Sequence, residues 1–339
     1  MAHLLEKSIL YILGLQDIGG GDAPSYYKIG VTSDSVAKRI SSLQTGNPYT
    51  IIPIFSIEVD GAQIIERNLH GIFAPNRRIL EWFNLSENEL EQVKQKASEL
   101  KEEISELIAT VRELDQTYSS DILIEASPHA LTLHKRVIEL ESEITKNALI
   151  MGILRAEMQS LTGKSKGITG ISRVLITNPK PSFKRSELRK FNPEIYAEYT
   201  TLPKFKNRLK IIGKPTPTSF PVLYAAKNEA VNALPVIETD EVTENRQQRI
   251  PEMVSLHDQY IEFVSNDAEL SMDLISTQLK IKVACGEARG IKGICEYIRE
   301  DRMTFDEARF ELEQPDLYEE FTIQSEPQRR FQLMKTKGY

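Results

Sequence analysis

Apolar residues near the N-terminus come in short runs that are typical of β-strands. Residues 8–13 are rich in β-forming residues, Gly19, Gly20 and Gly21 predict a loop, and residues 26–31 predict the return strand of a hairpin. A third strand is expected at residues 51–59. These runs predict a small sheet.

Two amphipathic segments accompany these strands. A short helix is expected ahead of the third strand and carries Lys38 and Arg39. Residues 62–73 predict a second helix, on which Glu66 and His70 are four residues apart and therefore share one side. We expect that side to face the hairpin.

Two longer segments show the heptad spacing of coiled coils. Ser86 and Glu89 form a capping box that opens the first, and the second has Asn147 at a core position, where Asn commonly fixes register or oligomeric state. The spacing is equally compatible with an antiparallel helical hairpin within one chain and with a homodimer. The seam positions are Leu90, Val93, Ala97, Leu100, Ile104, Leu107, Val111 and Leu114, and then Leu133, Val137, Leu140, Ile144, Asn147, Met151, Leu154, Met158 and Leu161.

The second half of the chain repeats itself. Leu133-His134 recurs as Leu256-His257 at an offset of 123 residues, and Phe183 matches Phe305 at an offset of 122. Each copy is expected to consist of a long helix, a Gly-Ile turn and two or three shorter helices. Because a segment rich in Pro, Thr and acidic residues joins the copies, they can be separate domains.

These patterns predict an α+β protein with a small α/β domain, coiled-coil helices and a duplicated all-α region. The expected segments are the α/β domain at 1–85, a coiled-coil connector at 86–127, the first copy at 128–213, a linker at 214–250 and the second copy at 251–339.

Charge separates the two copies. The chain has a net charge of -7, so any contact with DNA must be local. Residues 163–213 hold twelve Lys and Arg against three acidic residues, whereas residues 286–338 hold nine against twelve. We therefore expect the first copy to bind DNA and the second to contact protein. The candidate DNA contacts are Lys38, Lys184, Arg185, Arg189, Lys190, Lys204, Lys206 and Arg208, with Phe183, Phe191 and Tyr196 interleaved and expected to pack in a core.

Composition excludes several other classes. No run approaches the roughly 18 apolar residues of a membrane span. Cys285 and Cys295 match no disulfide framework or zinc pattern, and they take the places of Thr162 and Ser172 in the repeat. Small packed side chains and a cytoplasmic location are the expectation.

The N-terminal motifs resemble those of the GIY-YIG nuclease superfamily, in the phage and bacterial branch whose second motif reads Lys-Ile-Gly. The resemblance rests on residues 11–13, on Lys28-Ile29-Gly30, on Leu43-Gln44-Thr45-Gly46-Asn47-Pro48 and on the closing Glu81-Trp82-Phe83. The chain departs from the pattern at Ile9 and at Lys28, and it lacks the Asn expected near the end.

The resemblance implies roles for individual residues. Tyr11 looks like the general base or its relay, Arg39 like the phosphate clamp, and Glu66 like the sole carboxylate that holds one Mg²⁺ or Mn²⁺ ion. Lys28 is expected beside Tyr11, where it would favour the phenolate or help to activate water. His70 could complete the metal shell, orient the phosphate or make a structural hydrogen bond.

The sequence therefore predicts a metal-dependent DNA endonuclease targeted by its C-terminal region. The closing Glu81-Trp82-Phe83 is expected to serve packing rather than chemistry. The alternative is a catalytically inactive DNA-binding or assembly adaptor that retains the nuclease fold. The missing Asn and the altered first motif favour the adaptor, whereas Tyr11, Arg39 and Glu66 together favour the enzyme.

Overall fold

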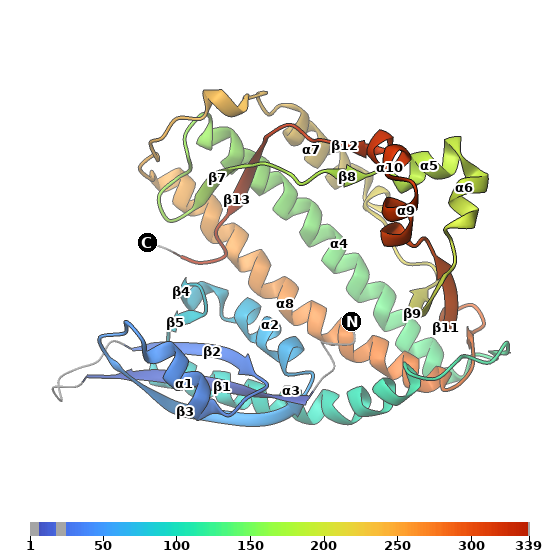
Figure 1. The fold of residues 1–339 in the computed structure, drawn as a ribbon. Helices are drawn as coiled ribbons and strands as arrows, with labels where there is room; N and C mark the ends of the chain where they lie inside the picture. Colours follow the sequence, from blue (N-terminus) through green and yellow to red (C-terminus); the bar gives the residue numbers. More distant parts are fainter. Residues whose placement is uncertain (1–6, 18–24, 338–339) are drawn as a thin grey trace.

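The N-terminal strands form one five-stranded sheet in a computed structural model that describes residues 7–17 and 25–337 (Figure 1). The order is β3-β1-β2-β5-β4, with antiparallel pairing throughout. The expected glycine loop at Gly19, Gly20 and Gly21 lies outside the described residues. The strands are β1 (Lys7–Gln16), β2 (Tyr26–Thr32), β3 (Thr50–Asp60), β4 (Arg77–Ile79) and β5 (Trp82–Asn84).

Alternate residues of β1 are buried on opposite faces of this sheet. Tyr11 and Leu13 pack toward α1 (Val36–Gln44). Leu10 and Ile12 pack toward the helices on the other face, α2 (Ala62–Ile72) and α3 (Glu87–Leu114). Because successive side chains of a strand point to opposite faces, a single run of apolar residues supplies both layers of the core.

Helix α3 packs on the sheet and on the long helix α8 (Pro251–Cys285), instead of forming a free coiled-coil connector. Its capping box at Ser86 and Glu89 is present as predicted. The buried row follows the predicted seam as far as Ile104 and then passes through Ile108 instead of Leu107. A straight α-helix has 3.6 residues per turn, so a 3.5-residue repeat drifts off its buried face.

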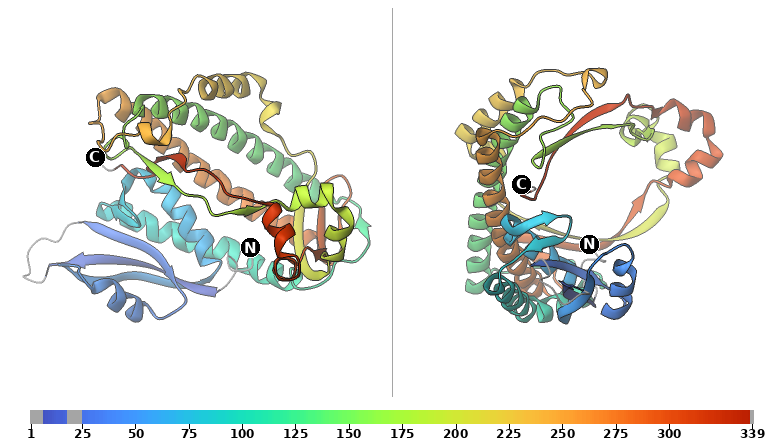
Figure 2. Two further views of the ribbon diagram at one scale, coloured as in Figure 1. Left: turned by 45° about the horizontal axis from the view of Figure 1, so that its top comes forward. Right: turned by 90° about the vertical axis from the view of Figure 1, so that its left-hand side faces the viewer.

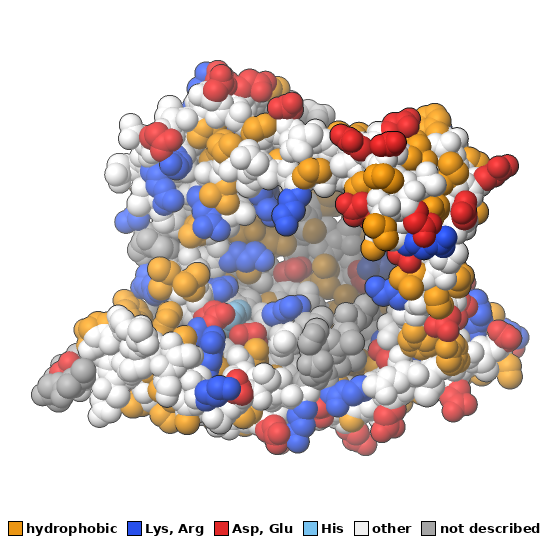
Figure 3. Space-filling model, in the orientation of Figure 1, with side chains coloured by type: hydrophobic (Ala, Val, Ile, Leu, Met, Phe, Trp, Pro, Cys, Tyr) orange, Lys and Arg blue, Asp and Glu red, His pale blue; other side chains and the backbone are white. Residues whose placement is uncertain are grey.

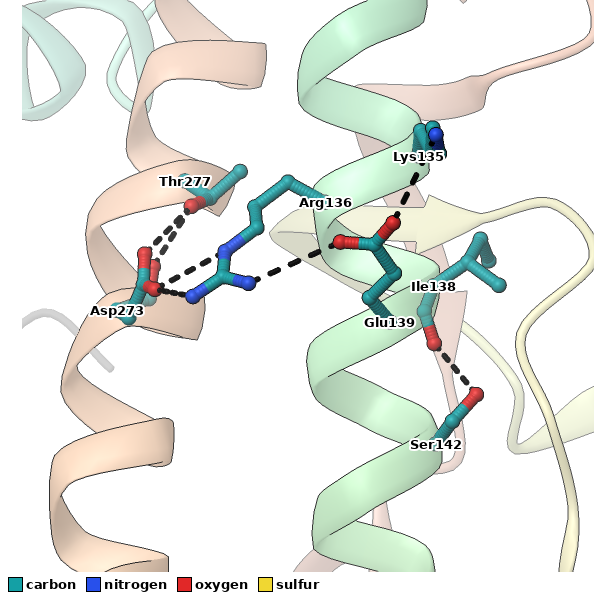
Figure 4. Close-up of polar contacts among 7 residues, drawn as sticks. All are labelled: Lys135, Arg136, Ile138, Glu139, Ser142, Asp273 and Thr277. Atoms are coloured by element: carbon teal, nitrogen blue, oxygen red, sulfur yellow. Dashed lines mark hydrogen bonds and ion pairs between the residues drawn. The ribbon is translucent and has the colours of Figure 1, made fainter.

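The second seam belongs to α4 (Pro128–Thr162), which runs antiparallel to α8 within the same chain (Figures 1 and 2). Asn147 Nδ2 donates to Asn266 Oδ1 at 3.0 Å. Arg136 of α4 also joins the two helices, because its Nε donates to Asp273 Oδ2 of α8 at 3.1 Å (Figure 4). Its Nη1 lies 3.7 Å from Glu139 Oε2 on its own helix. The antiparallel partner of the second seam within the chain is therefore α8, and not the first seam as the hairpin expectation implies.

The mixed α/β class, with an N-terminal sheet followed by a largely helical region, is confirmed. The expectation of an all-α second region is wrong, because strands flank the short helices. The short helices are α5 (Arg185–Phe191), α6 (Pro193–Glu198), α9 (Glu307–Glu313) and α10 (Pro315–Glu320). The strands are β6 (Leu123–Ile124), β7 (Ser172–Thr177), β8 (Ser182–Phe183), β9 (Leu202–Ile211), β10 (Gly290–Ile291), β11 (Cys295–Thr304), β12 (Thr322–Ile323) and β13 (Gln328–Leu333).

Most of these strands pair between the two halves of the region. β7 pairs with β13, β8 with β12, and β9 with β11. The residues 128–213 and 251–339 are therefore interlaced rather than separate in space. Helix α7 (Pro221–Asn232), in the expected linker, lies along α4.

The two cysteines fill a packing position. Cys285 Sγ lies 3.4 Å from Cys295 Sγ, and both side chains are buried. Thr162 Oγ1 lies 3.2 Å from Ser172 Oγ in the corresponding place of the other copy. No helix of the described residues is both long enough and apolar enough to cross a membrane.

Candidate active site

The site forms at the edge of β2, where β5 ends. β5 pairs with β2 only from Tyr26 to Lys28, so the polar backbone groups of Ile29 and Val31 need other partners. Helix α2 supplies two of them, because His70 Nε2 donates to the carbonyl of Ile29 at 2.9 Å and Glu66 accepts a hydrogen bond from the backbone of Val31. The N–H of Ile29 donates to the carbonyl of Glu81 at 3.2 Å. The edge of the sheet thereby fixes the position of Glu66.

Tyr11 reaches this edge from β1 by passing over Gly30. The two residues are directly opposite in the β1–β2 pair, and a Cβ on Gly30 would lie 2.6 Å from the Tyr11 hydroxyl oxygen. No side chain other than hydrogen fits there. The Gly of the Lys-Ile-Gly motif is therefore required for the placement of Tyr11.

Arg39 holds the hydroxyl of Tyr11. Its Nε donates to Tyr11 Oη at 3.1 Å, and the tyrosine ring is fully buried. Burial raises the pKa of Tyr11 above its usual value, although the hydrogen bond from Arg39 opposes this shift. At neutral pH Tyr11 is a neutral phenol, and this favours the relay role over that of a phenolate base.

Lys28 is paired with Glu81. Its ammonium group is buried beside β5 and donates to the Glu81 carboxylate. Burial alone would raise the pKa of Glu81, but the hydrogen bond and charge of Lys28 outweigh burial and lower it. Lys28 lies on the same face of the sheet as Tyr11, but its ammonium group is bonded to Glu81. This geometry favours a role for Lys28 on Glu81 over the expected role on Tyr11.

Glu66 has the most perturbed carboxyl group of the site. Burial raises the pKa of Glu66 to about 6, and the nearby negative charge of Glu81 contributes in the same direction. Lys28 and Arg67 oppose the shift without cancelling it. Glu66 is thus a carboxylate at neutral pH, and it forms no ion pair with another of the residues that the structure describes.

His70 has a structural role in this geometry. Its Nε2–H is engaged by Ile29, and its ring centroid lies 5.2 Å from that of Phe83. Burial lowers the pKa of His70 to about 4, so the imidazole is neutral at physiological pH. Of the alternatives left open by the sequence, the structural hydrogen bond is the one present.

Sequence reasoning missed two charged residues of the site, Glu81 and Arg77. Glu81 was assigned to packing, yet its charge acts on Tyr11, Arg39, Glu66 and His70. Arg77 lies over the ring of Phe83 at 5.8 Å, and burial lowers its pKa. The sequence signal that could have identified Glu81 as a site residue is its charge beside the two aromatic residues Trp82 and Phe83.

Gln44, in the quoted motif after α1, is a brace rather than a catalytic residue. Its Nε2 donates to the carbonyl of Tyr49 at 2.9 Å, and its Oε1 accepts from the backbone of Ile51 at 2.9 Å. These bonds tie the end of α1 to β3. They help to hold Arg39 over Tyr11.

The predicted DNA contacts lie on different elements and differ in their partners. Lys38 pairs with Asp34 at 3.0 Å, and Arg185 pairs with Glu307 of the other copy. The side chains of Arg189 and Lys190 lie over the rings of Tyr196 and Phe191, at 5.8 and 4.9 Å. Lys184 is half-buried, whereas Lys204, Lys206 and Arg208 are exposed on β9. Phe183 and Tyr196 pack in a core as expected, but Phe191 is exposed.

The carboxylate of Glu66 fits a divalent ion that keeps most of its water ligands. Within residues 7–17 and 25–337 there is no cluster of three or more His, Cys, Asp or Glu side chains that could enclose a metal. Glu66 offers carboxylate oxygens, whereas Glu81 is engaged by Lys28 and His70 by Ile29. Mg²⁺ commonly binds in this way, through one or two carboxylates, several waters and substrate phosphates.

Residues 8–98 match the T5orf172 domain, a phage-associated domain that occurs in nuclease contexts. The match begins in β1 and ends within α3, so it includes every residue of the site described above as well as the first part of the helix that packs on the sheet. No curated protein and no solved structure matches the chain.

Proposed function

We propose that this protein is a metal-dependent DNA endonuclease, with Tyr11, Arg39 and Glu66 as its catalytic residues. The observation that supports this most strongly is the meeting of these side chains, from β1, α1 and α2, at one edge of β2, with Lys28 and Glu81 beside them. The match of these residues to the T5orf172 domain, which is associated with nucleases, adds support.

The side chains divide the work of phosphodiester hydrolysis. Arg39 bonds Tyr11 through Nε, so its two terminal nitrogens can bind phosphate oxygens. Tyr11 accepts that bond, and because its ring is fully buried its hydroxyl would act on the phosphate through Arg39, which it orients. Glu66 would hold Mg²⁺ or Mn²⁺, an ion that stabilises the charge on the attacking or leaving oxygen.

Lys28 and Glu81 act as positioning residues in this proposal. Their ion pair sets the charge around Glu66, because Glu81 raises and Lys28 lowers the pKa of that carboxyl group. Incubation of supercoiled plasmid with the wild-type protein and Mg²⁺ or Mn²⁺ tests the activity. Nicked or linear product supports an endonuclease, and intact plasmid with every metal tried would favour the inactive adaptor.

The rate of cleavage should rise with pH through about 6. A carboxyl group whose pKa is raised to about 6 is protonated below that pH and cannot hold a cation, whereas above it the carboxylate is available. Rates measured at low concentrations of metal and DNA report the free enzyme and should show this midpoint. A profile that is flat between pH 5 and 7 would contradict the assignment.

Replacement of Glu81 by Gln should move this midpoint below 6. The substitution removes a negative charge that raises the pKa of Glu66, and it frees the cation of Lys28, which lowers it. The same pH–rate measurement on Glu58→Gln, an exposed carboxylate on β3, should leave the midpoint in place. An unchanged or higher midpoint for Glu81→Gln would show that Glu66 does not govern the rate.

A further inference from the structure

The two halves of the C-terminal region contact each other reciprocally. Phe183 stacks on Tyr318 with ring centroids 4.7 Å apart, and the corresponding pair, Tyr196 and Phe305, is 5.0 Å apart. Each half also repeats one bond of its own: His134 donates to the carbonyl of Ile212, and His257 to that of Met334, both at 2.8 Å. Contacts in which each member of a pair is repeated by its equivalent define an approximate two-fold axis.

This symmetry relates the ribbon β9–β11 to the ribbon β7–β13. Leu209 lies opposite Tyr297 in the first, and the equivalent residues Phe331 and Val174 lie opposite each other in the second. The two ribbons lie on opposite sides of the region between the long helices and the short helices α5, α6, α9 and α10 (Figure 2). Figure 3 shows the surface hollowed between the N-terminal unit and the strands above it, with Lys and Arg side chains and also Asp and Glu side chains around the hollow.

One face of β9–β11 is covered. Leu209 and Ile211 pack on the long helices, the ring of Phe205 lies 5.2 Å from that of Tyr118, and Asn207 Nδ2 donates to the carbonyl of Asp115. The chain between α3 and α4, which includes Tyr118, passes below these strands in Figure 1. The side chains of the opposite face are exposed along β9 from Lys204 to Lys210.

That opposite face carries a row of cations, which we call the β9 row: Lys204, Lys206 and Arg208. They are exposed and occupy alternate positions, so neighbouring members are about 6.8 Å apart along the strand. No ion pair or hydrogen bond of these three side chains occurs among the described residues. The acids on the same face have other partners, because Glu296 pairs with Lys210 at 3.7 Å and Glu300 with Arg302 at 2.9 Å.

The symmetry-related ribbon places cations on the other side of the hollow. Val174 and Phe331 are buried in the core, so alternation turns Arg173 and Arg330 to the opposite face, and both are exposed. The strand that corresponds to β9 is β13, where Gln328 takes the place of Lys206. β13 therefore offers fewer cations to this face than β9 does.

We propose that the two ribbons form a clamp for DNA, in which the β9 row follows one phosphate backbone and Arg173 and Arg330 contact the DNA from the opposite side. This inference rests on the proposed function, because it takes DNA as the substrate. It uses only part of the sequence-based set of cations: the α5 residues Arg185, Arg189 and Lys190 are not part of the proposed clamp.

The experiment compares two triple variants that lose the same charge from the same copy. Binding of a fluorescent 30-base-pair DNA duplex is measured between 50 and 250 mM salt for wild type, for Lys204→Gln/Lys206→Gln/Arg208→Gln, and for Arg185→Gln/Arg189→Gln/Lys190→Gln. Each cation that contacts phosphate contributes about one to the slope of log affinity against log salt. We expect the magnitude of that slope to fall by about two to three in the β9 variant and by less than one in the α5 variant.

A smaller variant tests the other side of the clamp. Arg173→Gln/Arg330→Gln should reduce the slope by about one to two. Equal slopes for wild type and the β9 variant, or equal losses in both triple variants, would overturn the clamp, as would a wild-type protein that does not bind the duplex. Circular dichroism melting identifies any variant that has failed to fold.

Plasmid cleavage separates this inference from the function on which it rests. Duplex binding with the expected slopes but no cleavage would support the clamp and reject the endonuclease. Cleavage by wild type with unaltered binding by the β9 variant would reject the clamp alone.

Discussion

Glu66→Gln should slow plasmid nicking by at least about 100-fold while leaving the protein folded. The amide keeps the size and the hydrogen bond from Val31, but it cannot supply the negative charge that holds a divalent cation. Loss of one charged group that stabilises a transition state typically lowers the rate by about 10² to 10³-fold. The measurement is the initial rate of nicking with Mg²⁺ for wild type and variant, purified in parallel.

Two further readouts separate catalysis from folding. The melting temperature of Glu66→Gln should be unchanged or higher at pH 7.5, because burial of the ionised side chain is unfavourable and the amide removes that cost. Glu58→Gln provides the matched control and should nick DNA at the wild-type rate. If Glu66→Gln nicks as fast as wild type, the cutting comes from another site or from a contaminating enzyme.

Gly30→Ala should lower the cleavage rate by about 100-fold. The added methyl group would lie 2.6 Å from the Tyr11 hydroxyl oxygen and 2.8 Å from the ring carbon that bears it, so the ring must move away from Arg39. A misplacement of about 1 Å can reduce the rate by this factor. Single-turnover cleavage of a labelled duplex measures the effect without interference from product release.

Gly46→Ala is the control for backbone effects in the same domain. Gly46 has φ of 78°, but a Cβ there meets nothing within 4 Å, so alanine causes strain without a collision. We expect Gly46→Ala to lower the melting temperature and to retain the cleavage rate of its folded fraction. Equal losses of rate in the two alanine variants would mean that Gly30 matters for stability alone.

The sequence predicted well those features that depend on neighbouring residues. Short apolar runs identified β1, β2 and β3, and the spacing of Glu66 and His70 placed both on one side of α2. The alternation of Lys204, Phe205, Lys206, Asn207 and Arg208 is also a strand signal. The expectation of a helical region there is wrong, because this segment is held as a strand by β11, which begins more than 80 residues later in the chain.

The chemistry of the site depends on contacts that no local pattern contains. Lys28 and Glu81 are 53 residues apart, so their ion pair follows only from the pairing of β2 with β5. The raised pKa of Glu66 likewise arises from burial and from Glu81. Sequence motifs could identify Tyr11, Arg39 and Glu66 as candidates, but not the charge balance in which they act.

A double-mutant cycle in single-turnover cleavage tests the central claim most directly, namely that these side chains act on one phosphodiester. Tyr11→Phe, Arg39→Ala and the double variant are compared with wild type in Mg²⁺. Because Arg39 bonds the Tyr11 hydroxyl, the double variant should lose about as much rate as the more damaging single variant. Losses that multiply, or four proteins that cut at the same rate, would contradict a shared site.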